Sequence, residues 1–157
     1  MATNLTISLA TQIRGTFSNA LDLSTPVEAI TYNAQLDFTN GTGVNQANKV
    51  WHDQRTGTGH TLDLTTGLTD PWGNNIVFTK LRGFLFRCIT TTAGVIVDVG
   101  GSFFSQAGLL ISVTSVPAGG FWSMVNPVDG WIVDSTFKTI TLSGTGATFD
   151  IFLIGSV

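Results

Sequence analysis

Residues 76–89 carry apolar side chains at both the odd and the even positions of the run. Successive side chains of a strand point to opposite faces, so a strand that is apolar on both faces must be covered on both. The aromatic and β-branched residues of this run, the glycine inside it and the turn-forming residues on either side favour a strand over a helix. We therefore predict a central strand of a β-sandwich here. Lys80, Arg82 and Arg87 must each reach water or a polar partner.

Alternating or apolar runs recur along the rest of the chain. The clearest alternation covers residues 29–38, where every second residue is apolar. The other strands are expected at residues 5–9, 13–17, 46–56, 62–64, 95–99, 109–113, 121–125, 131–133, 137–142 and 148–154. The last of these is apolar on both faces, which predicts a position beside other central strands. Residues 102–110 form at most one helical turn, since Gly108 interrupts them and no capping pattern precedes them.

Short strands separated by turn signals every 8–12 residues are typical of an all-β sandwich or barrel. The sequence predicts an all-β fold, a jelly-roll-like antiparallel β-sandwich formed by residues 26–157. Residues 1–25 are expected to be an N-terminal arm or edge strands, and Pro26 cannot occupy a central strand. Trp72 stands in a turn and is expected to fold back over one end of the core.

Charged residues make up 11% of the chain, against roughly 25% in an average soluble domain. Few surface charges give little protection against association, so we expect a homo-oligomer, a trimer first and a dimer next. The net charge of −3 and the scattered basic residues argue against nucleic acid as a partner. No secretion signal and no apolar run long enough for a membrane helix are seen, and no membrane contact is expected.

His52, Asp53, His60 and Asp63 are the first candidates for chemistry, because two histidines and two carboxylates could hold a metal ion. However, His52 and Asp53 are adjacent on a strand and point to opposite faces, so neither a metal nor a cofactor is expected. No nucleophile elbow is present, and we predict no catalytic residues and no enzyme. Cys88 has no possible intrachain disulfide partner and is expected to be a buried structural thiol.

The four tryptophans, Trp51, Trp72, Trp122 and Trp131, have two interpretations. They could form a stacking platform for a sugar, as in carbohydrate-binding modules. Each has apolar neighbours in the sequence, which favours burial in the core or in a subunit interface.

Several short segments occur together in a familiar order. They are Val50-Trp51-His52-Asp53-Gln54-Arg55-Thr56, Leu62-Asp63-Leu64, Gly67-Leu68-Thr69-Asp70, Gly73, Phe78-Thr79-Lys80, Val97-Asp98-Val99-Gly100-Gly101, Pro117-Ala118-Gly119-Gly120 and Phe149-Asp150-Ile151. Together these segments, which span residues 50–155, resemble small virion structural proteins of tailed bacteriophages, of the kind taken to be head decoration (cement) proteins.

The resemblance implies a β-sandwich without catalytic residues, often trimeric, made in the cytoplasm of the host bacterium and located on the capsid surface of the virion. The implied partner is the major capsid protein, and the implied role is to stabilise the bacteriophage head. Residues 1–45 lie outside the resemblance and are expected to contact neighbouring subunits. The alternative is a tail or host-attachment protein that binds a receptor or a glycan, and a carbohydrate-binding module is a third possibility.

Overall fold

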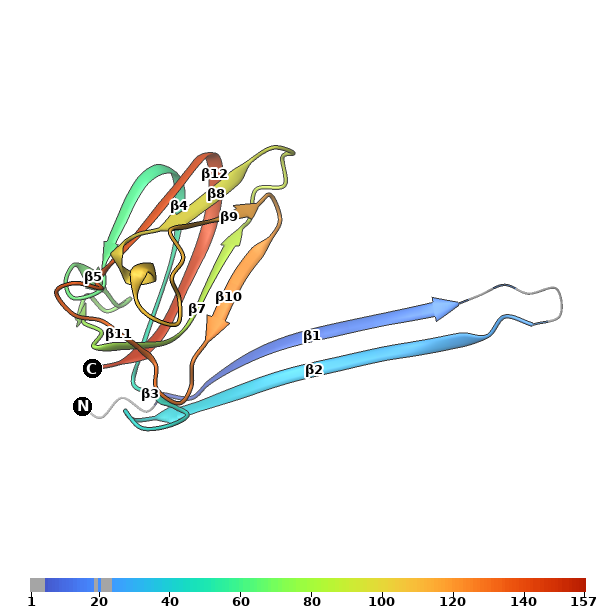
Figure 1. Cartoon of the computed structure of the whole chain (residues 1–157), viewed down its shortest axis with the longest axis horizontal. Helices are drawn as coiled ribbons and strands as arrows, with labels where there is room; N and C mark the ends of the chain where they lie inside the picture. The colour runs from blue at the N-terminus through green and yellow to red at the C-terminus, as the bar shows by residue number, and fades with distance from the viewer. Residues whose placement is uncertain (1–4, 19, 21–23) are drawn as a thin grey trace.

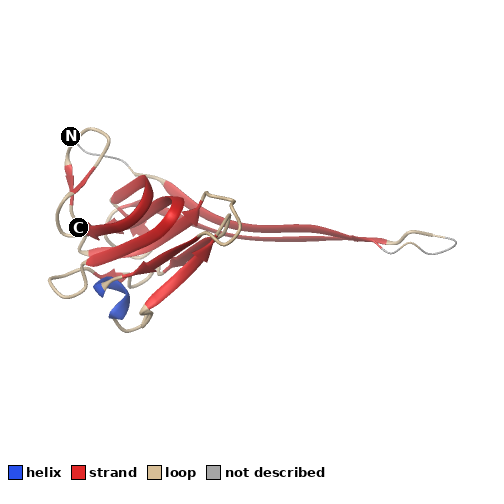
Figure 2. Cartoon of the chain, turned by 90° about the horizontal axis from the view of Figure 1, so that it is seen from above, coloured by secondary structure: helices blue, strands red, loops and turns tan. Residues whose placement is uncertain are grey.

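The computed structural model describes residues 5–18, 20 and 24–157, which form a β-sandwich and a long hairpin that projects from it (Figure 1). The hairpin consists of β1 (Ile7–Ser18) and β2 (Val27–Asn40), and we call it the arm. The two strands pair antiparallel along their length, from Ile7 opposite Phe38 to Ser18 opposite Val27. Seen from above, the arm stays a single two-stranded ribbon beyond the sandwich (Figure 2).

The sandwich contains the remaining strands and one short helix. They are β3 (Gln46–Ala47), β4 (Lys49–Asp63), β5 (Leu68–Thr69), β6 (Asn75–Ile76), β7 (Lys80–Cys88), β8 (Ile96–Gly100), the 3-10 helix Ser102–Ser105, β9 (Val113–Pro117), β10 (Phe121–Val125), β11 (Trp131–Ile132) and β12 (Thr139–Ser156).

β12 is the strand that both layers of the sandwich share. It pairs with β4 on one side along nearly its whole length. On its other side, its C-terminal half pairs with β7 and its N-terminal part with β8. β10 and β11 then extend the first layer from β7, and β9 extends the second layer from β8. The β4–β12 ribbon bends between the layers at a register shift, where Gly57 and Gly146 have φ of 94° and 68°.

The core between the layers is dominated by aromatic rings. Phe84 lies at its centre, with ring centroids 4.9 Å from Trp122, 5.4 Å from Trp131 and 5.5 Å from Phe104. Edge-to-face and tilted contacts of this kind add to the free energy gained by burying the rings. Cys88 is fully buried among apolar residues of the same cluster.

The fold class predicted from the sequence is confirmed: the protein is all-β, with antiparallel sheets that form a β-sandwich. β7 lies between β10 and β12, as expected of a central strand. The C-terminal half of β12 lies between β4 and β7, as its two apolar faces predicted. Residues 102–105 form the single helical turn that was expected.

Other details of the prediction are wrong. Residues 5–9 and 13–17 were expected as separate strands, but Ile7–Ser18 forms one continuous strand that pairs with β2. The arm therefore contains both strands of the hairpin, whereas the sequence division placed β2 in the sandwich; part of the expected loop, residues 21–23, lies outside the described residues. Residues 137–142 and 148–154 belong to the single strand β12. Trp72 does not cover the core, because 81% of its surface is exposed.

Arg82 resolves the problem of a charge inside the central strand. It lies where the pairing of β7 with β12 shifts register, and only 2% of its surface is exposed. Its Nη1 donates hydrogen bonds to the carbonyl oxygens of Pro127 and Val128, and its Nη2 donates to that of Thr42. Since Thr42 follows β2, this guanidinium ties the base of the arm to the sandwich.

We expect Gly155→Ala to lower the free energy of unfolding by about 1–3 kcal/mol, because a Cβ at this position would collide with the carbonyl oxygen of Lys80. Urea denaturation measures the change. Gly15→Ala is the matched control, since apart from Gly15 and its two chain neighbours no residue has an atom within 4 Å of the position that its Cβ would take. Equal stability of the Gly155→Ala variant and the wild-type protein would contradict this account of the β7–β12 contact.

Candidate functional site: the arm and the face at its base

The four candidate metal ligands all lie on β4, but the structure does not gather them into a site. His52 stacks on Phe152, with ring centroids 5.5 Å apart. The Asp53 carboxylate accepts a hydrogen bond of 2.8 Å from Nε of Arg55. His60 packs edge-on to Phe149. Within residues 5–18, 20 and 24–157, no three His, Cys, Asp or Glu side chains come together as a metal ion would require.

Asp63 has a structural role at the end of β4. Its carboxylate pairs with the Lys138 ammonium at 2.8 Å and accepts hydrogen bonds from the backbone and the hydroxyl of Thr65. The hydrogen bond from Lys138, followed by that from the Thr65 hydroxyl, lowers the pKa of Asp63 to about 2. The ion pair joins the end of β4 to the residue that precedes β12.

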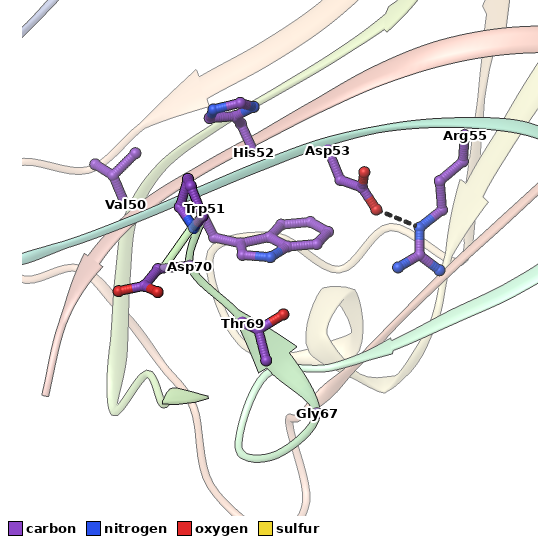
Figure 3. A pocket seen from close by; sticks show the side chains of 9 residues that line it. Val50, Trp51, His52, Asp53, Arg55, Gly67, Thr69 and Asp70 are labelled. Atoms are coloured by element: carbon purple, nitrogen blue, oxygen red, sulfur yellow. Dashed lines mark hydrogen bonds and ion pairs between the residues drawn. The ribbon is translucent and has the colours of Figure 1, made fainter. Parts of the chain in front are cut away.

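A hollow of about 230 Å³ lies beside Trp51 (Figure 3). Its lining includes His52, Asp53, Arg55 and the loop that carries Asp70. The Arg55 guanidinium carbon lies 5.9 Å from the centroid of the Trp51 ring, and Arg55 is already paired with Asp53. Only 6% of Trp51 is exposed, so this indole does not offer an open face to a sugar ring.

The tryptophans do not form the stacking platform that the sequence left open. Trp131 is buried and Trp122 packs against the core, while Trp72 alone is strongly exposed. The interpretation as core residues is therefore confirmed for Trp51, Trp122 and Trp131.

The strongest candidate for a functional surface is the arm. The register of β1 and β2 places apolar residues of both strands on one face of the ribbon, which we call the apolar face. From the base outward, its paired positions are Ile7 with Phe38, Leu9 with Leu36, Thr11 with Ala34, Ile13 with Tyr32, Gly15 with Ile30 and Phe17 with Glu28. The opposite face carries mostly polar residues, among them Ser8, Gln12, Asn33 and Asp37.

The base of the apolar face packs on the sandwich. Phe38 is fully buried, and Ile7, Leu9 and Leu36 are half-buried around it, against Ile154 and neighbouring residues of the sheet. This second, small core fixes the arm to the outer surface of the layer that contains β7 and β10.

Farther out, the same face has no cover within the described part of the chain. Ile13 is 58% exposed, Tyr32 58%, Ile30 52% and Phe17 66%. A two-stranded ribbon is marginally stable in water by itself, and contiguous exposed apolar side chains mark interaction sites. β1 has β2 as its one strand partner among the described residues, so its outer backbone edge is also open. The arm thus combines an exposed apolar face with an open backbone edge, two features suited to docking.

The sequence contained half of the signal for this surface. The alternation of residues 29–38 predicted one amphipathic strand. Thr11 and Gly15 interrupt the corresponding alternation of β1, so the sequence did not show that β1 continues and pairs with β2 to build one long apolar face.

No protein-family model matches the sequence, and neither a curated protein nor a solved structure matches the chain. Among the described residues, no helix has the length and apolar character needed to cross a membrane.

We expect Asp63→Asn to lower the free energy of unfolding by about 1 kcal/mol at neutral pH, because the variant cannot pair with Lys138. The folded-state pKa of Asp63 is depressed to about 2, from an ordinary value of 3.8. The carboxylate therefore stabilises the fold above pH 3.8, and this contribution is lost as the pH falls toward 2. Thermal unfolding at several pH values should show the gap between wild type and variant closing over that range, and a constant gap would contradict the assignment.

Proposed function

We propose that this chain is a non-enzymatic structural protein of a tailed-bacteriophage virion that binds the outer surface of the capsid and stabilises the head. The arm carries this proposal, because its outer half exposes an apolar face that no described part of its own chain covers. The resemblance of residues 50–155 to head decoration proteins supports the choice of a virion among the possible assemblies.

The arm is suited to reach across a boundary between neighbouring subunits. Its strands contain 12 and 14 residues. At about 3.3 Å per residue, this length spans roughly 40 Å. A capsid must resist the pressure of the DNA packed inside it, and a clip that buries surface across a seam raises the free energy of opening that seam. Many copies on one shell make modest individual contacts sufficient.

In this proposal the partner is the major capsid protein, and the protein acts as a trimer on the capsid surface after synthesis in the host cytoplasm. The low charge content, 11% of residues, suits contacts made by apolar and hydrogen-bonding groups. The charge balance and the scattered basic residues do not favour nucleic acid as a partner.

A tail or host-attachment protein is the second candidate. One observation favours it: Trp72, at the turn between β5 and β6, is 81% exposed and follows Pro71. An exposed indole at a loop tip is a suitable stacking surface for a sugar of a host receptor.

Shortening the arm tests the proposed function. Residues 12–33 are replaced by Asn-Gly, which joins the paired residues Thr11 and Ala34 through a tight turn and keeps the packed base. We expect occupancy on purified particles that lack this protein to fall at least tenfold, because the exposed apolar face is removed. Co-sedimentation with the particles measures the occupancy.

Trp72→Ala is the matched control, since it removes an exposed aromatic residue away from the arm and should leave capsid occupancy unchanged. Unchanged binding of the shortened variant would remove the arm from the mechanism. Cryo-electron microscopy of intact particles gives the location directly, and density at the tail tip with none on the head would contradict the capsid proposal and favour the second candidate.

A further inference from the structure

The sheet surface next to the base of the arm is a second exposed surface with apolar residues. β10, β7, β12 and β4 lie side by side, and their register defines rows of outward-facing residues. These rows are Val125, Gly83, Ile154 and Val50; then Ser123, Leu85, Phe152 and His52; then Phe121, Arg87, Asp150 and Gln54. Val125, Ile154 and Val50 of the first row pack with the base of the arm, whereas the second and third rows are open.

The two open rows, which we call the acceptor face, carry large apolar side chains. Phe121 is 61% exposed and Phe152 43%, and Leu85 between them is half-buried. The apolar face of the arm and the acceptor face meet at the small core around Phe38. They cannot cover one another, because the arm leads away from the sandwich (Figures 1 and 2).

The uncovered part of the arm is long enough to cross the acceptor face. The uncovered part of β1, Thr11 to Phe17, extends over about 20 Å at 3.3 Å per residue. Four neighbouring strands at about 4.8 Å spacing span about 14 Å from the first strand axis to the last. An arm that crosses the strands of a second sandwich can therefore cover the acceptor face from one side to the other.

The two surfaces also match in charge. Glu28, the one glutamate of the sequence, is exposed on the apolar face opposite Phe17, near the tip. Arg87 is the cation of the acceptor face and is exposed beside Phe121. Neither side chain makes an ion pair within the described residues. Asp150, the carboxylate in the same row, accepts a hydrogen bond from Gln54.

From these observations we infer that the occupant of the acceptor face is the arm of a second copy of this chain. The apolar face of the arm enters over β4 of its neighbour and crosses β12, so that Glu28, near the tip, pairs with Arg87 on β7. Ile13, Tyr32 and Ile30 cover Leu85 and Phe152. This inference rests on the docking role that the proposed function gives to the arm, but it names a second copy of this chain, in place of the capsid, as the occupant of the arm's apolar face. It does not require a capsid.

The contact joins two different surfaces, so it is heterologous. Such contacts build a closed ring when the rotation between copies closes, and an open chain when it does not. Each copy donates one arm and accepts one. In a ring, the apolar face of every arm and every acceptor face are therefore covered. A ring of three has a mass of about 50 kDa, from a chain of 16.7 kDa.

Charge reversal tests the pairing in the full-length protein. Sedimentation equilibrium at micromolar concentrations measures the mass and the dissociation constant. We expect Glu28→Arg alone and Arg87→Glu alone to raise the dissociation constant at least tenfold, because each places like charges together. The double variant should return to within about threefold of wild type. Arg14→Glu is the matched control, since Arg14 lies on the opposite face of the arm, paired with Thr31, and should change nothing.

A mixing experiment distinguishes this contact from a bundle of arms. Ile13→Asp damages the arm and Phe121→Asp damages the acceptor face, both at exposed positions that should leave the sandwich folded. Each variant alone should be monomeric. A mixture should give dimers and nothing larger, because an intact arm on the Phe121→Asp chain meets one intact acceptor face.

The assembly measurements test the contact between copies independently of the capsid-binding experiment. Circular dichroism spectra equal to wild type exclude unfolding as the cause of a loss of assembly. A monomeric wild-type protein, or full assembly by the Phe121→Asp variant, overturns the inference. If the wild-type monomer still occupied capsids through its arm, the proposed function would stand and the second copy would be excluded as the occupant.

Discussion

The backbone hydrogen bonds on the two sides of β12 hold the sandwich together. β12 has β4 on one side along nearly its whole length, and β8 and then β7 on the other, so its backbone has strand partners on both sides in each layer. The other strands of the main sheet pair either with β12 itself or with a strand that pairs with β12. The contact between β7 and β12 also explains two residues. Gly155 has no side chain, so the backbone of Lys80 can approach it closely. Arg82 lies beside this contact and donates hydrogen bonds to three carbonyl groups.

This arrangement also explains how a short chain can carry a long arm. The inner face of the β7 layer is filled by the aromatic cluster around Phe84, and part of its outer face remains available. Phe38 and its neighbours use that part to attach the ribbon, and the Arg82 hydrogen bond to Thr42 holds the chain where it leaves β2. The arm is therefore fixed at one end, while its outer half contributes no burial to its own chain. Contiguous exposed apolar side chains of this kind mark interaction sites.

The candidate chemistry of the sequence has structural explanations in the described residues. Asp53 neutralises Arg55 beside Trp51, and Asp63 neutralises Lys138. His52 and His60 pack on phenylalanine rings of β12. The four residues of β4 that the sequence offered as metal ligands therefore each contact a different neighbour, and they do not converge on one point. The exposed apolar face of the arm is the feature that distinguishes this molecule.

The sequence by itself determined the fold class, most strand positions, the single helical turn and the burial of Cys88, because two-residue alternation and turn residues act locally. It did not determine which strands pair. That residues 29–38 pair with β1, that β12 serves both layers, and that Trp72 points to solvent were decided by tertiary contacts between residues far apart in the chain. The apolar face of the arm was set by the register of two strands, since a shift of one residue would move each apolar side chain to the opposite face. The low charge content alone predicted association, whereas the exposed apolar face of the arm is defined only once its two strands are paired.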